Sequence, residues 1–222
     1  MEPLLKLVNV SKVYRPDDHP IHAVKNVNLK IKKGEFIAIM GPSGSGKSTL
    51  MHLIGCLDVP TSGQVILEGK NLSQLSEEEL AKIRSQKIGF VFQTFNLIPR
   101  TSSLDNIALP LIYTGTNLHK REELARKMLK IVDLEKRADH YPNQLSGGEQ
   151  QRIAIARALI NNPLIILADE PTGNLDTKSG QEIMNIFAKL NQEGKTIIIV
   201  THESQIAKHA RRTIKIIDGE II

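Results

Sequence analysis

A glycine-rich stretch has the residue types and spacing best suited to chemistry, because it fits the pattern G-x-x-x-x-G-K-[ST]. Its residues are Gly41, Pro42, Ser43, Gly44, Ser45, Gly46, Lys47, Ser48 and Thr49. Glycine permits backbone angles that a Cβ would forbid, so consecutive N–H groups can point toward phosphate oxygens. Lys47 can reach β- and γ-phosphates, the Ser48 hydroxyl can ligate Mg²⁺, and Thr49 is placed to support the α-phosphate side. The stretch therefore predicts a phosphate-binding loop.

The segments on either side of this loop favour the same interpretation. The apolar run at 36–40 indicates a buried strand, and residues 48–57 have apolar side chains at helical spacing. A helix that begins near Lys47 would add the positive end of its dipole to the loop. The alternative, a flexible glycine turn before a helix, is disfavoured by this strand–loop–helix context.

Polar residues with catalytic potential follow two other apolar runs, at 164–168 and 196–200. The carboxyl ends of strands are where open α/β sheets bind ligands. Asp169 suits the hydration shell of Mg²⁺, and Glu170 could orient or deprotonate an attacking water. His202 could hydrogen-bond a γ-phosphate and hold that water. The alternatives are a solvated acidic turn and a structural or surface histidine, and the nearby phosphate loop favours the catalytic interpretation.

A second anion site is predicted at 145–152, where the sequence reads LSGGEQQR. Ser146 can cap a helix, and Gly147 and Gly148 leave the backbone N–H groups uncovered. An ordinary helix start is the alternative. Because one chain has one nucleotide to bind, a second site of this kind suggests action in trans, on nucleotide held by another subunit.

The hydrophobic pattern predicts an α/β chain. Alternation within 21–31 is typical of a half-exposed antiparallel strand, whereas the later, near-continuous apolar runs favour a buried parallel sheet. Residues 94–162 are mostly helical in pattern, and a turn is expected through 16–18. The other expected strands are 4–10, 36–40, 64–68, 88–92, 164–168, 196–200 and 213–217. The other expected helices are 76–84, with a capping box at its start, 119–132, 146–160 and 179–190.

The overall composition limits the classes of function that the chain could have. The chain has 222 residues and a net charge of +5, but only 4% aromatic residues and no tryptophan. Stacking platforms for bases are therefore scarce, and the scattered basic residues favour a solvated surface over a nucleic-acid face. The single cysteine excludes an internal disulfide and fits a reducing compartment. No signal peptide is expected at the start, and no apolar run approaches the ~20 residues that span a bilayer, so a membrane role would require a partner.

From about residue 4 to 222, the sequence resembles the ATP-binding subunit of an ABC transporter. The matches are 41–48 with the Walker A loop, Gln93 with the Q-loop, 145–150 with the signature motif, 164–169 with Walker B, Glu170 with the catalytic glutamate, 174–176 with the D-loop, His202 with the switch histidine and Tyr14 with the adenine-stacking aromatic. Taken alone, Tyr14 is equally compatible with an ordinary strand-end aromatic. The strings at 54–58, 92–99 and 109–113 are similar to the MacB, LolD and FtsE branch, which powers lipoprotein release, macrolide or peptide efflux and cell-wall signalling at the inner membrane.

The resemblance implies a P-loop NTPase core with a mainly parallel sheet, an N-terminal antiparallel β subdomain and an inserted α-helical subdomain. Residues 1–222 would form a single ABC ATPase domain. Within it, 1–93 and 163–222 would be the ATP-binding core with the β subdomain, and 94–162 would be the helical signature-motif subdomain.

The resemblance also implies ATP hydrolysis coupled to transport, with ATP and Mg²⁺ as cofactors. The implied catalytic residues are Glu170, His202, Gln93 and Lys47, and the implied Mg²⁺ ligands are Ser48, Gln93 and Asp169. ATP binding would close a head-to-tail homodimer that encloses two ATP molecules. Each nucleotide would contact Lys47, Ser48 and Tyr14 of one chain, and Ser146 and Gly148 of the other. The full set of implied nucleotide-binding residues is 41–49, Tyr14, Ser146, Gly147, Gly148 and Asp176.

The implied partner is an integral-membrane permease, which would place the chain peripherally at the cytoplasmic side of the inner membrane, and soluble when isolated. Gln93 would pass movement to the helical subdomain. Phe95, Leu97, Ile98 and Pro99 are candidates for the floor of a groove that receives a permease helix, with ordinary subdomain core as the alternative.

Three other functions are alternatives to transport. Nucleic-acid-maintenance ATPases share the same head but carry coiled-coil or zinc insertions, and this chain has neither sustained heptads nor Cys/His clusters. Ribosome-associated relatives normally hold two heads, whereas one Walker A loop is present here. A non-enzymatic nucleotide-binding module is disfavoured because Glu170 and His202 are both present.

Overall fold

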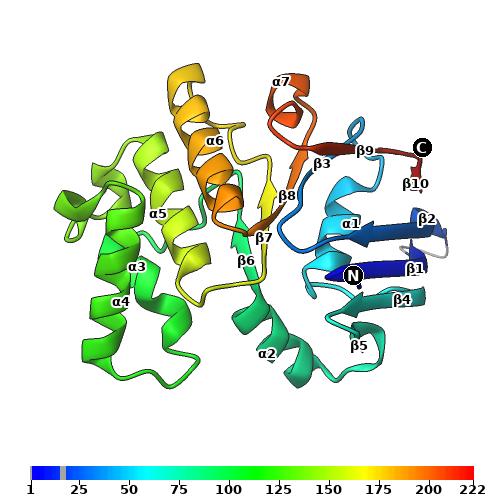
Figure 1. The fold of residues 1–222 in the computed structure, drawn as a ribbon, viewed down its shortest axis with the longest axis horizontal. Coiled ribbons are helices and arrows are strands. Elements are labelled where there is room, and N and C mark those ends of the chain that lie inside the picture. The colour runs from blue at the N-terminus through cyan, green and yellow to red at the C-terminus, as the bar shows by residue number, and fades with distance from the viewer. Residues whose placement is uncertain (1, 16–18) are drawn as a thin grey trace. The chain divides into compact units, whose positions relative to one another are not determined.

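The computed structural model describes residues 2–15 and 19–222, so the turn expected through 16–18 lies outside the described residues. The chain forms two compact units, one made of residues 1–84 and 191–222 and the other of residues 85–190 (Figure 1). The division at 94–162 proposed from sequence remains a prediction.

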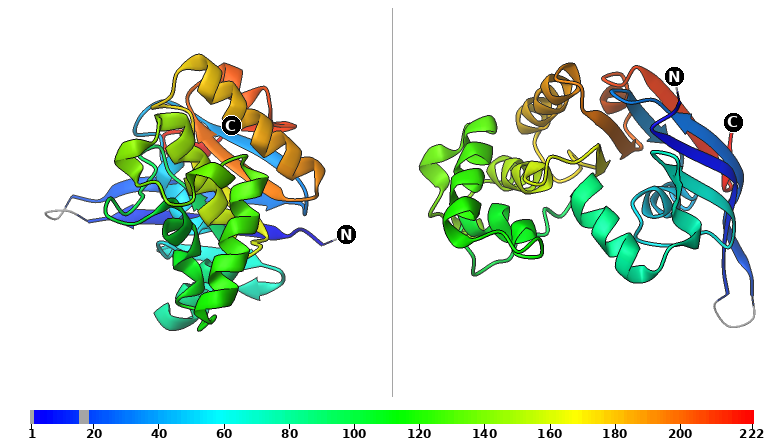
Figure 2. Two further views of the ribbon diagram at one scale, coloured as in Figure 1. Left: turned by 90° about the vertical axis from the view of Figure 1, so that its left-hand side faces the viewer. Right: turned by 60° about the horizontal axis from the view of Figure 1, so that its bottom comes forward.

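The first unit contains a four-stranded antiparallel sheet in the order β2-β1-β4-β5. Its strands are β1 (Leu5–Tyr14), β2 (Ile21–Ile31), β4 (Ser62–Leu67) and β5 (Lys70–Asn71). Figure 2 shows β1 and β2 side by side as a long ribbon, paired from Leu5 opposite Ile31 to Tyr14 opposite Ile21. Val24, Val27 and Leu29 are buried on one face of β2, which confirms the half-exposed strand expected from their alternation.

The first unit also contains strands in the order β10-β9-β3-β8. These are β3 (Phe36–Met40), β8 (Thr196–Thr201), β9 (Arg212–Ile217) and β10 (Glu220–Ile221). Strand β3 is parallel to both β8 and β9, and only β10 runs antiparallel to its neighbour. The central strands β3 and β8 are almost wholly buried, which explains their continuous apolar runs.

Helices cover these sheets. Helix α1 (Lys47–Ile54) packs against β2 and β8, and the short α7 (Ser204–Ala207) packs against β3 and β8. Helix α2 (Glu77–Lys87) follows the one-turn helix η1 (Leu72–Gln74). Its predicted capping box is confirmed, because Glu79 N–H donates to Ser76 Oγ at 3.3 Å and Ser76 N–H donates to Glu79 Oε2 at 3.1 Å.

The second unit combines two parallel strands with a helical cluster. The strands are β6 (Ile88–Val91) and β7 (Ile165–Asp169). The helices are α3 (Ser103–Ala108), η2 (Leu109–Leu111), α4 (Leu118–Ile131), η3 (Glu135–Arg137), η4 (Pro142–Gln144), α5 (Gly147–Leu159) and α6 (Thr177–Gln192), the last of which ends just beyond the unit. Helices α3, α4 and α5 pack against one another. The structure describes residues 94–162 throughout, and every secondary-structure element in this stretch is a helix, as the pattern predicted.

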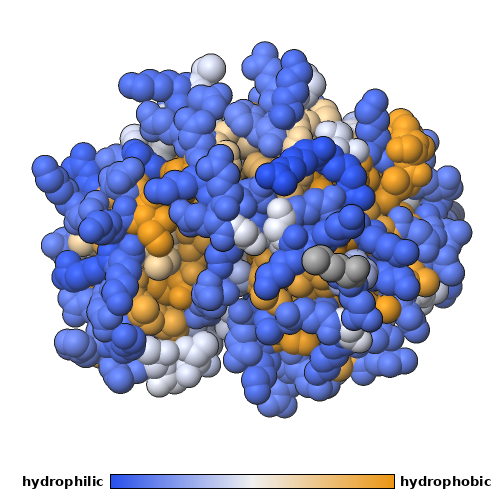
Figure 3. Space-filling model, in the orientation of Figure 1, coloured by the Kyte–Doolittle hydropathy of each residue, from blue (hydrophilic) through white to orange (hydrophobic). Residues whose placement is uncertain are grey.

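The surface is largely hydrophilic, with apolar patches between charged side chains (Figure 3). Large apolar side chains that reach solvent include Ile112, Tyr113 and Leu118, around the start of α4. Among the described residues, every helix is too short or too polar to cross a bilayer.

Candidate functional site

The glycine-rich loop lies between the carboxyl end of β3 and the start of α1, as predicted. Gly46 is the residue before the helix and has a φ of 100°, and no side chain caps the helix. A Cβ on Gly41 would overlap the carbonyl oxygen of Ile216, and one on Gly46 would overlap that of Ala23. Only glycine fits at these two positions, and the first-turn N–H groups of α1 are left without intrahelical acceptors.

Lys47 and Ser45 give this loop its charge and polarity. Lys47 is 8% exposed, and its ammonium group folds back over the loop to donate to Pro42 O at 2.7 Å. The Ser45 hydroxyl is buried and finds no hydrogen-bond partner among the described residues. A largely buried cation beside an uncapped helix N-terminus fits a phosphate-bearing ligand, because both features favour negative charge.

His202 follows the strand beside the one that leads into this loop. In the parallel pairing of β3 with β8, Met40 lies opposite Thr201. The loop and His202 therefore leave the same edge of the sheet, as their positions after two apolar runs predicted. The turn at His202 is held by Thr201 Oγ1, which accepts from Glu203 N–H at 3.0 Å, and His202 itself is exposed.

Tyr14, the last residue of β1, is anchored by groups that the sequence did not reveal. Its hydroxyl donates to Asp58 Oδ2 at 2.8 Å, and Lys12 Nζ donates to Asp58 Oδ1 at 2.5 Å. Lys12 Nζ also lies 5.0 Å from the centroid of the Tyr14 ring, within cation–π range. The only sequence signal for Asp58 is its place at the end of the 54–58 string.

The pKa shifts of this cluster follow from the same contacts. Burial and the hydrogen bond to Asp58 raise the pKa of Tyr14, and a hydrogen bond with Thr49 opposes them. Burial alone would raise the pKa of Asp58, but hydrogen bonds from Lys12, Tyr14 and the Val59 N–H lower it below its usual value.

The second unit gathers the other predicted residues at the ends of β6 and β7. Val91 lies opposite Ala168 in this parallel pair, so Gln93, which follows β6, and Asp169, the last residue of β7, lie at the ends of neighbouring strands. The Gln93 side chain donates to Asn174 Oδ1 at 3.3 Å, and Asn174 Nδ2 donates to Gln93 O at 3.1 Å. Glu170 has a left-handed backbone with a φ of 43°, which is uncommon for a residue other than glycine.

The signature segment begins helix α5, and its predicted cap is confirmed. Ser146 Oγ accepts from Glu149 N–H at 3.3 Å, and Ser146 N–H donates to Glu149 Oε2 at 2.8 Å. A Cβ on Gly148 would lie 3.0 Å from Ser179 Oγ, so glycine permits close packing there. Ser179 donates to Asp176 from its backbone N–H at 3.0 Å and from its hydroxyl at 2.6 Å. The signature and the D-loop of the same chain are therefore neighbours.

Each unit thus assembles part of the predicted site. The first brings together residues 41–49, Tyr14 and His202. The second brings together Gln93, Asp169, Glu170, Asp176 and residues 146–148. The residues missed from sequence are Lys12 and Asp58 in the first unit, and Gln151 and Arg157, described below, in the second.

Comparison with known proteins gives one consistent result. The family model described as "ABC transporter" matches residues 24–173. The ABC transporter ATP-binding protein MJ0796 of Methanocaldococcus jannaschii is 55% identical over 223 residues, covering 98% of this chain and 95% of that protein. The macrolide export ATP-binding/permease protein MacB of Chlorobaculum tepidum is 55% identical over 219 residues, covering 99% of this chain and 34% of that protein.

Solved structures of ABC transporter cassettes resemble this chain as well. A dimeric post-hydrolysis structure of the MJ0796 cassette bound to ADP and Pi has a TM-score of 0.90 and 53% sequence identity, covering 98% of this chain and 96% of that one. A structure of CbiO1 from Clostridium perfringens, part of an ABC transporter complex, has a TM-score of 0.88 and 30% identity.

The chain belongs to the ABC transporter family, in which it is an ATP-binding subunit with the α/β cassette fold. This assignment confirms the resemblance identified from the motifs. The nucleic-acid alternative finds no support among these relatives.

Proposed function

We propose that this chain hydrolyses MgATP and that ATP-dependent closure and opening of a homodimer drives an integral-membrane permease. The observation that carries the proposal is the loop at the end of β3. It has an uncapped helix N-terminus, glycines that no other residue could replace, and a largely buried lysine, at the sheet edge that also carries His202.

In this proposal residues 41–49 hold the phosphates, and the Tyr14 ring stacks on adenine. The hydrogen bond from the Tyr14 hydroxyl to Asp58 supports the second role, because it fixes the position of the ring. Ser48, Gln93 and Asp169 would hold Mg²⁺, since hydroxyl, amide and carboxylate oxygens are the hard ligands it prefers. When bound, Mg²⁺ neutralises charge on the β- and γ-phosphate oxygens.

Hydrolysis would then need an oriented water and a sensor of the terminal phosphate. We assign the first role to the Glu170 carboxylate, a positioned general base, and the second to His202. The Gln93 amide, tied to Asn174, would report the state of the nucleotide to the helical elements.

The homodimer and the permease partner are proposed from the relatives. MJ0796 structures are described as dimeric, and in MacB an ATP-binding part and a permease share one protein. Ser146 is exposed at the start of α5 and so is available to cap nucleotide held by a second copy. The proposed task of the transporter is efflux of a macrolide or peptide, or lipoprotein release. The proposed location of this chain is the cytoplasmic side of the inner membrane.

The docking surface for the permease is proposed at residues 95–99. Ile98 is 41% exposed, and Pro99 is also exposed, which favours a surface role over ordinary core. Phe95 and Asn96 both have left-handed backbones, with φ of 61° and 51°. Such a turn presents a fixed shape to a partner because its backbone conformation is tightly restricted.

Phosphate release from MgATP tests the enzymatic claim. We expect turnover by the purified chain, and loss of ATP binding in Lys47→Ala by isothermal titration calorimetry, because the ammonium group lies over the loop. No phosphate release above background would refute the enzymatic claim. Undiminished ATP binding by Lys47→Ala would remove Lys47 from the proposed site.

A further inference from the structure

Gln151 is a polar side chain placed where an apolar one would be expected. It lies in α5 and its relative exposure is 0%. Its Nε2 donates to Pro171 O at 2.6 Å and to Phe92 O at 3.3 Å, across 20 and 59 residues of sequence. Because both acceptors are carbonyl oxygens, the amide nitrogen must face them.

The carbonyl oxygen of the Gln151 side chain indicates that packing alone does not explain a glutamine at this position. Gln151 Oε1 is buried and finds no hydrogen-bond partner among the described residues. A buried acceptor without a partner destabilises a fold, so an apolar side chain of similar volume would serve packing better. What glutamine provides at this position is a donor shared by two distant carbonyl groups.

The first carbonyl belongs to the turn that begins at Glu170. Glu170 O accepts from Gly173 N–H at 3.0 Å, which makes Pro171 and Thr172 the central residues of the turn. Glu170 has a φ of 43°, and the proline after it restricts its backbone further. A residue in such a conformation persists only where the surroundings hold it, and the Gln151 amide contacts the central peptide of this turn.

The second carbonyl belongs to the turn that contains Gln93. Phe92 O accepts from Phe95 N–H at 3.2 Å as well as from Gln151. Helix α5 holds the same turn at a second point, because the Arg157 guanidinium donates to Phe95 O at 2.8 Å and also to Asn96 O. One helix therefore fixes the segments that follow both strands of the unit.

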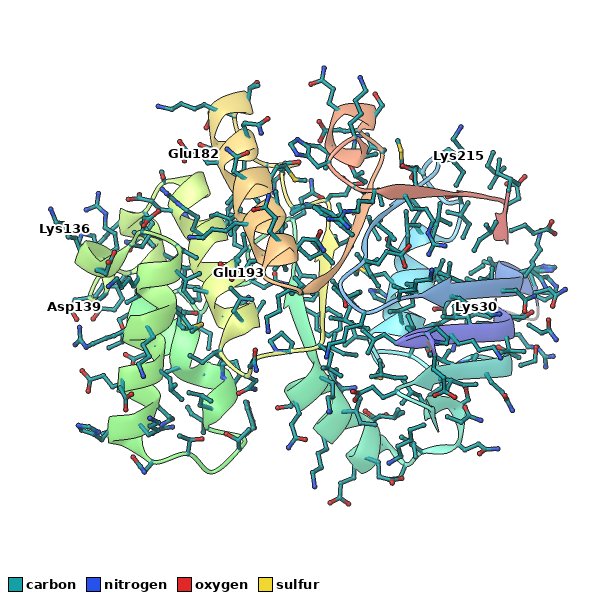
Figure 4. All side chains as sticks on the ribbon, in the orientation of Figure 1. Lys30, Lys136, Asp139, Glu182, Glu193 and Lys215 are labelled. Carbon is teal, nitrogen blue, oxygen red and sulfur yellow. The ribbon has the colours of Figure 1, made fainter. Side chains whose placement is uncertain are left out.

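Helix α5 does not depend on Gln151 for its place. Its apolar residues 153–156 are fully buried. Arg152 Nη1 lies 3.9 Å from a carboxylate oxygen of Glu182, which Figure 4 labels on α6. Removal of the Gln151 amide should therefore loosen the two turns without displacing the helix, while Arg157 still holds the Gln93 turn at its other point.

We propose that Gln151 is a positioning residue for ATP hydrolysis, which holds the Glu170 turn and the Gln93 turn in fixed register with the signature helix. The inference rests on the proposed ATPase function, in which Glu170 acts on the attacking water. It assigns no contact between Gln151 and the nucleotide.

The test is steady-state phosphate release and ATP binding by Gln151→Met, which keeps the side-chain volume and removes both donated hydrogen bonds. We expect kcat to fall about 10- to 100-fold, as small displacements of a reacting group can cost, with KM within about twofold of the wild type. In the Glu170→Gln background the same change should lower the residual rate by less than about twofold, because a residue that acts through Glu170 loses its effect there. Gln151→Asn, which reaches at most one carbonyl, should give an intermediate kcat at unchanged KM.

Asn191→Leu is the matched control. Asn191 is also a buried amide, and its Nδ2 bridges the carbonyl oxygens of Gly34 and Lys195, both at 2.9 Å. We expect it to lower the melting temperature while kcat per folded molecule stays at the wild-type value. Wild-type kcat in both Gln151 variants, or equal losses with and without Glu170, would overturn the inference while the ATPase proposal stands. A wild-type chain that releases no phosphate would overturn both.

Discussion

The anchor of Tyr14 allows a sharp prediction for Asp58→Asn. The Asp58 carboxylate accepts hydrogen bonds from Lys12 at 2.5 Å, from Tyr14 at 2.8 Å and from the Val59 N–H at 2.7 Å. The substitution removes the negative charge, so the charge-assisted hydrogen bonds from Lys12 and Tyr14 are lost, and the Tyr14 hydroxyl can at most exchange a weaker, neutral hydrogen bond with the amide. The Lys12 side chain is 12% exposed and that of Asp58 is 25% exposed, so the pair is only partly screened by solvent.

Two magnitudes follow for Asp58→Asn. Breaking a buried pair costs ~3–5 kcal/mol, and we reduce this to about 2 kcal/mol of unfolding free energy because solvent reaches both groups. Held less firmly, the Tyr14 side chain must be immobilised when adenine stacks on it, at a cost of about 0.5–1.5 kcal/mol. ATP should therefore bind about 3- to 10-fold more weakly, since 1.4 kcal/mol is about tenfold in affinity.

The assay is isothermal titration calorimetry with ATP and with inorganic tripolyphosphate, alongside urea unfolding. Tripolyphosphate carries the phosphates but no base, so its affinity should not change in Asp58→Asn. Tyr14→Phe, which removes only the hydroxyl, should weaken ATP binding in the same direction and by a smaller factor. Equal weakening of ATP and tripolyphosphate, or unchanged ATP affinity in a destabilised variant, would refute the reasoning.

Two further predictions concern the second unit. Burial alone would raise the pKa of Glu149, but hydrogen bonds from Ser146 and Arg137 outweigh it and lower that pKa below its usual value. The contribution of Glu149 to stability is therefore present above the pKa of an unfolded-state glutamate and is lost as pH falls through the lower folded-state pKa. Urea unfolding should therefore show a steeper loss of stability on acidification for the wild type than for Glu149→Gln, and parallel curves would contradict this. Ile98→Asp should reduce copurification with the membrane subunit, whereas Ile131→Asp, at a side chain of similar exposure on α4, should not; equal recovery of both would exclude the proposed docking surface.

The features that were predictable from sequence depend on local pattern. The loop at 41–49 has a fixed glycine spacing between an apolar run and a helical one, so strand, loop and helix could all be expected. The cap at Ser146 and the capping box at Ser76 each join residues that lie within four positions of one another, so a local pattern could predict them. Strands β3, β7 and β8 were recognisable because burial on both faces leaves continuous apolar runs.

The features that were missed depend on contacts between distant residues. Lys12 and Asp58 are 46 residues apart, and the acceptors of Gln151 lie 20 and 59 residues from it. Nothing in the neighbourhood of Gln151 distinguishes it from the adjacent Gln150, which donates to Leu145 O within its own helix start. Strand β10 has only two residues, too few for any alternation to be visible.

The central claim, that ATP joins two copies of this chain, is tested most directly by sedimentation velocity of Glu170→Gln with and without MgATP. This variant should bind ATP but turn it over slowly, so the closed state accumulates. We predict a monomer without nucleotide and a dimer at saturating MgATP, with the dimer lost when Ser146→Arg is added. A Glu170→Gln chain that binds ATP by calorimetry and remains monomeric would contradict the account.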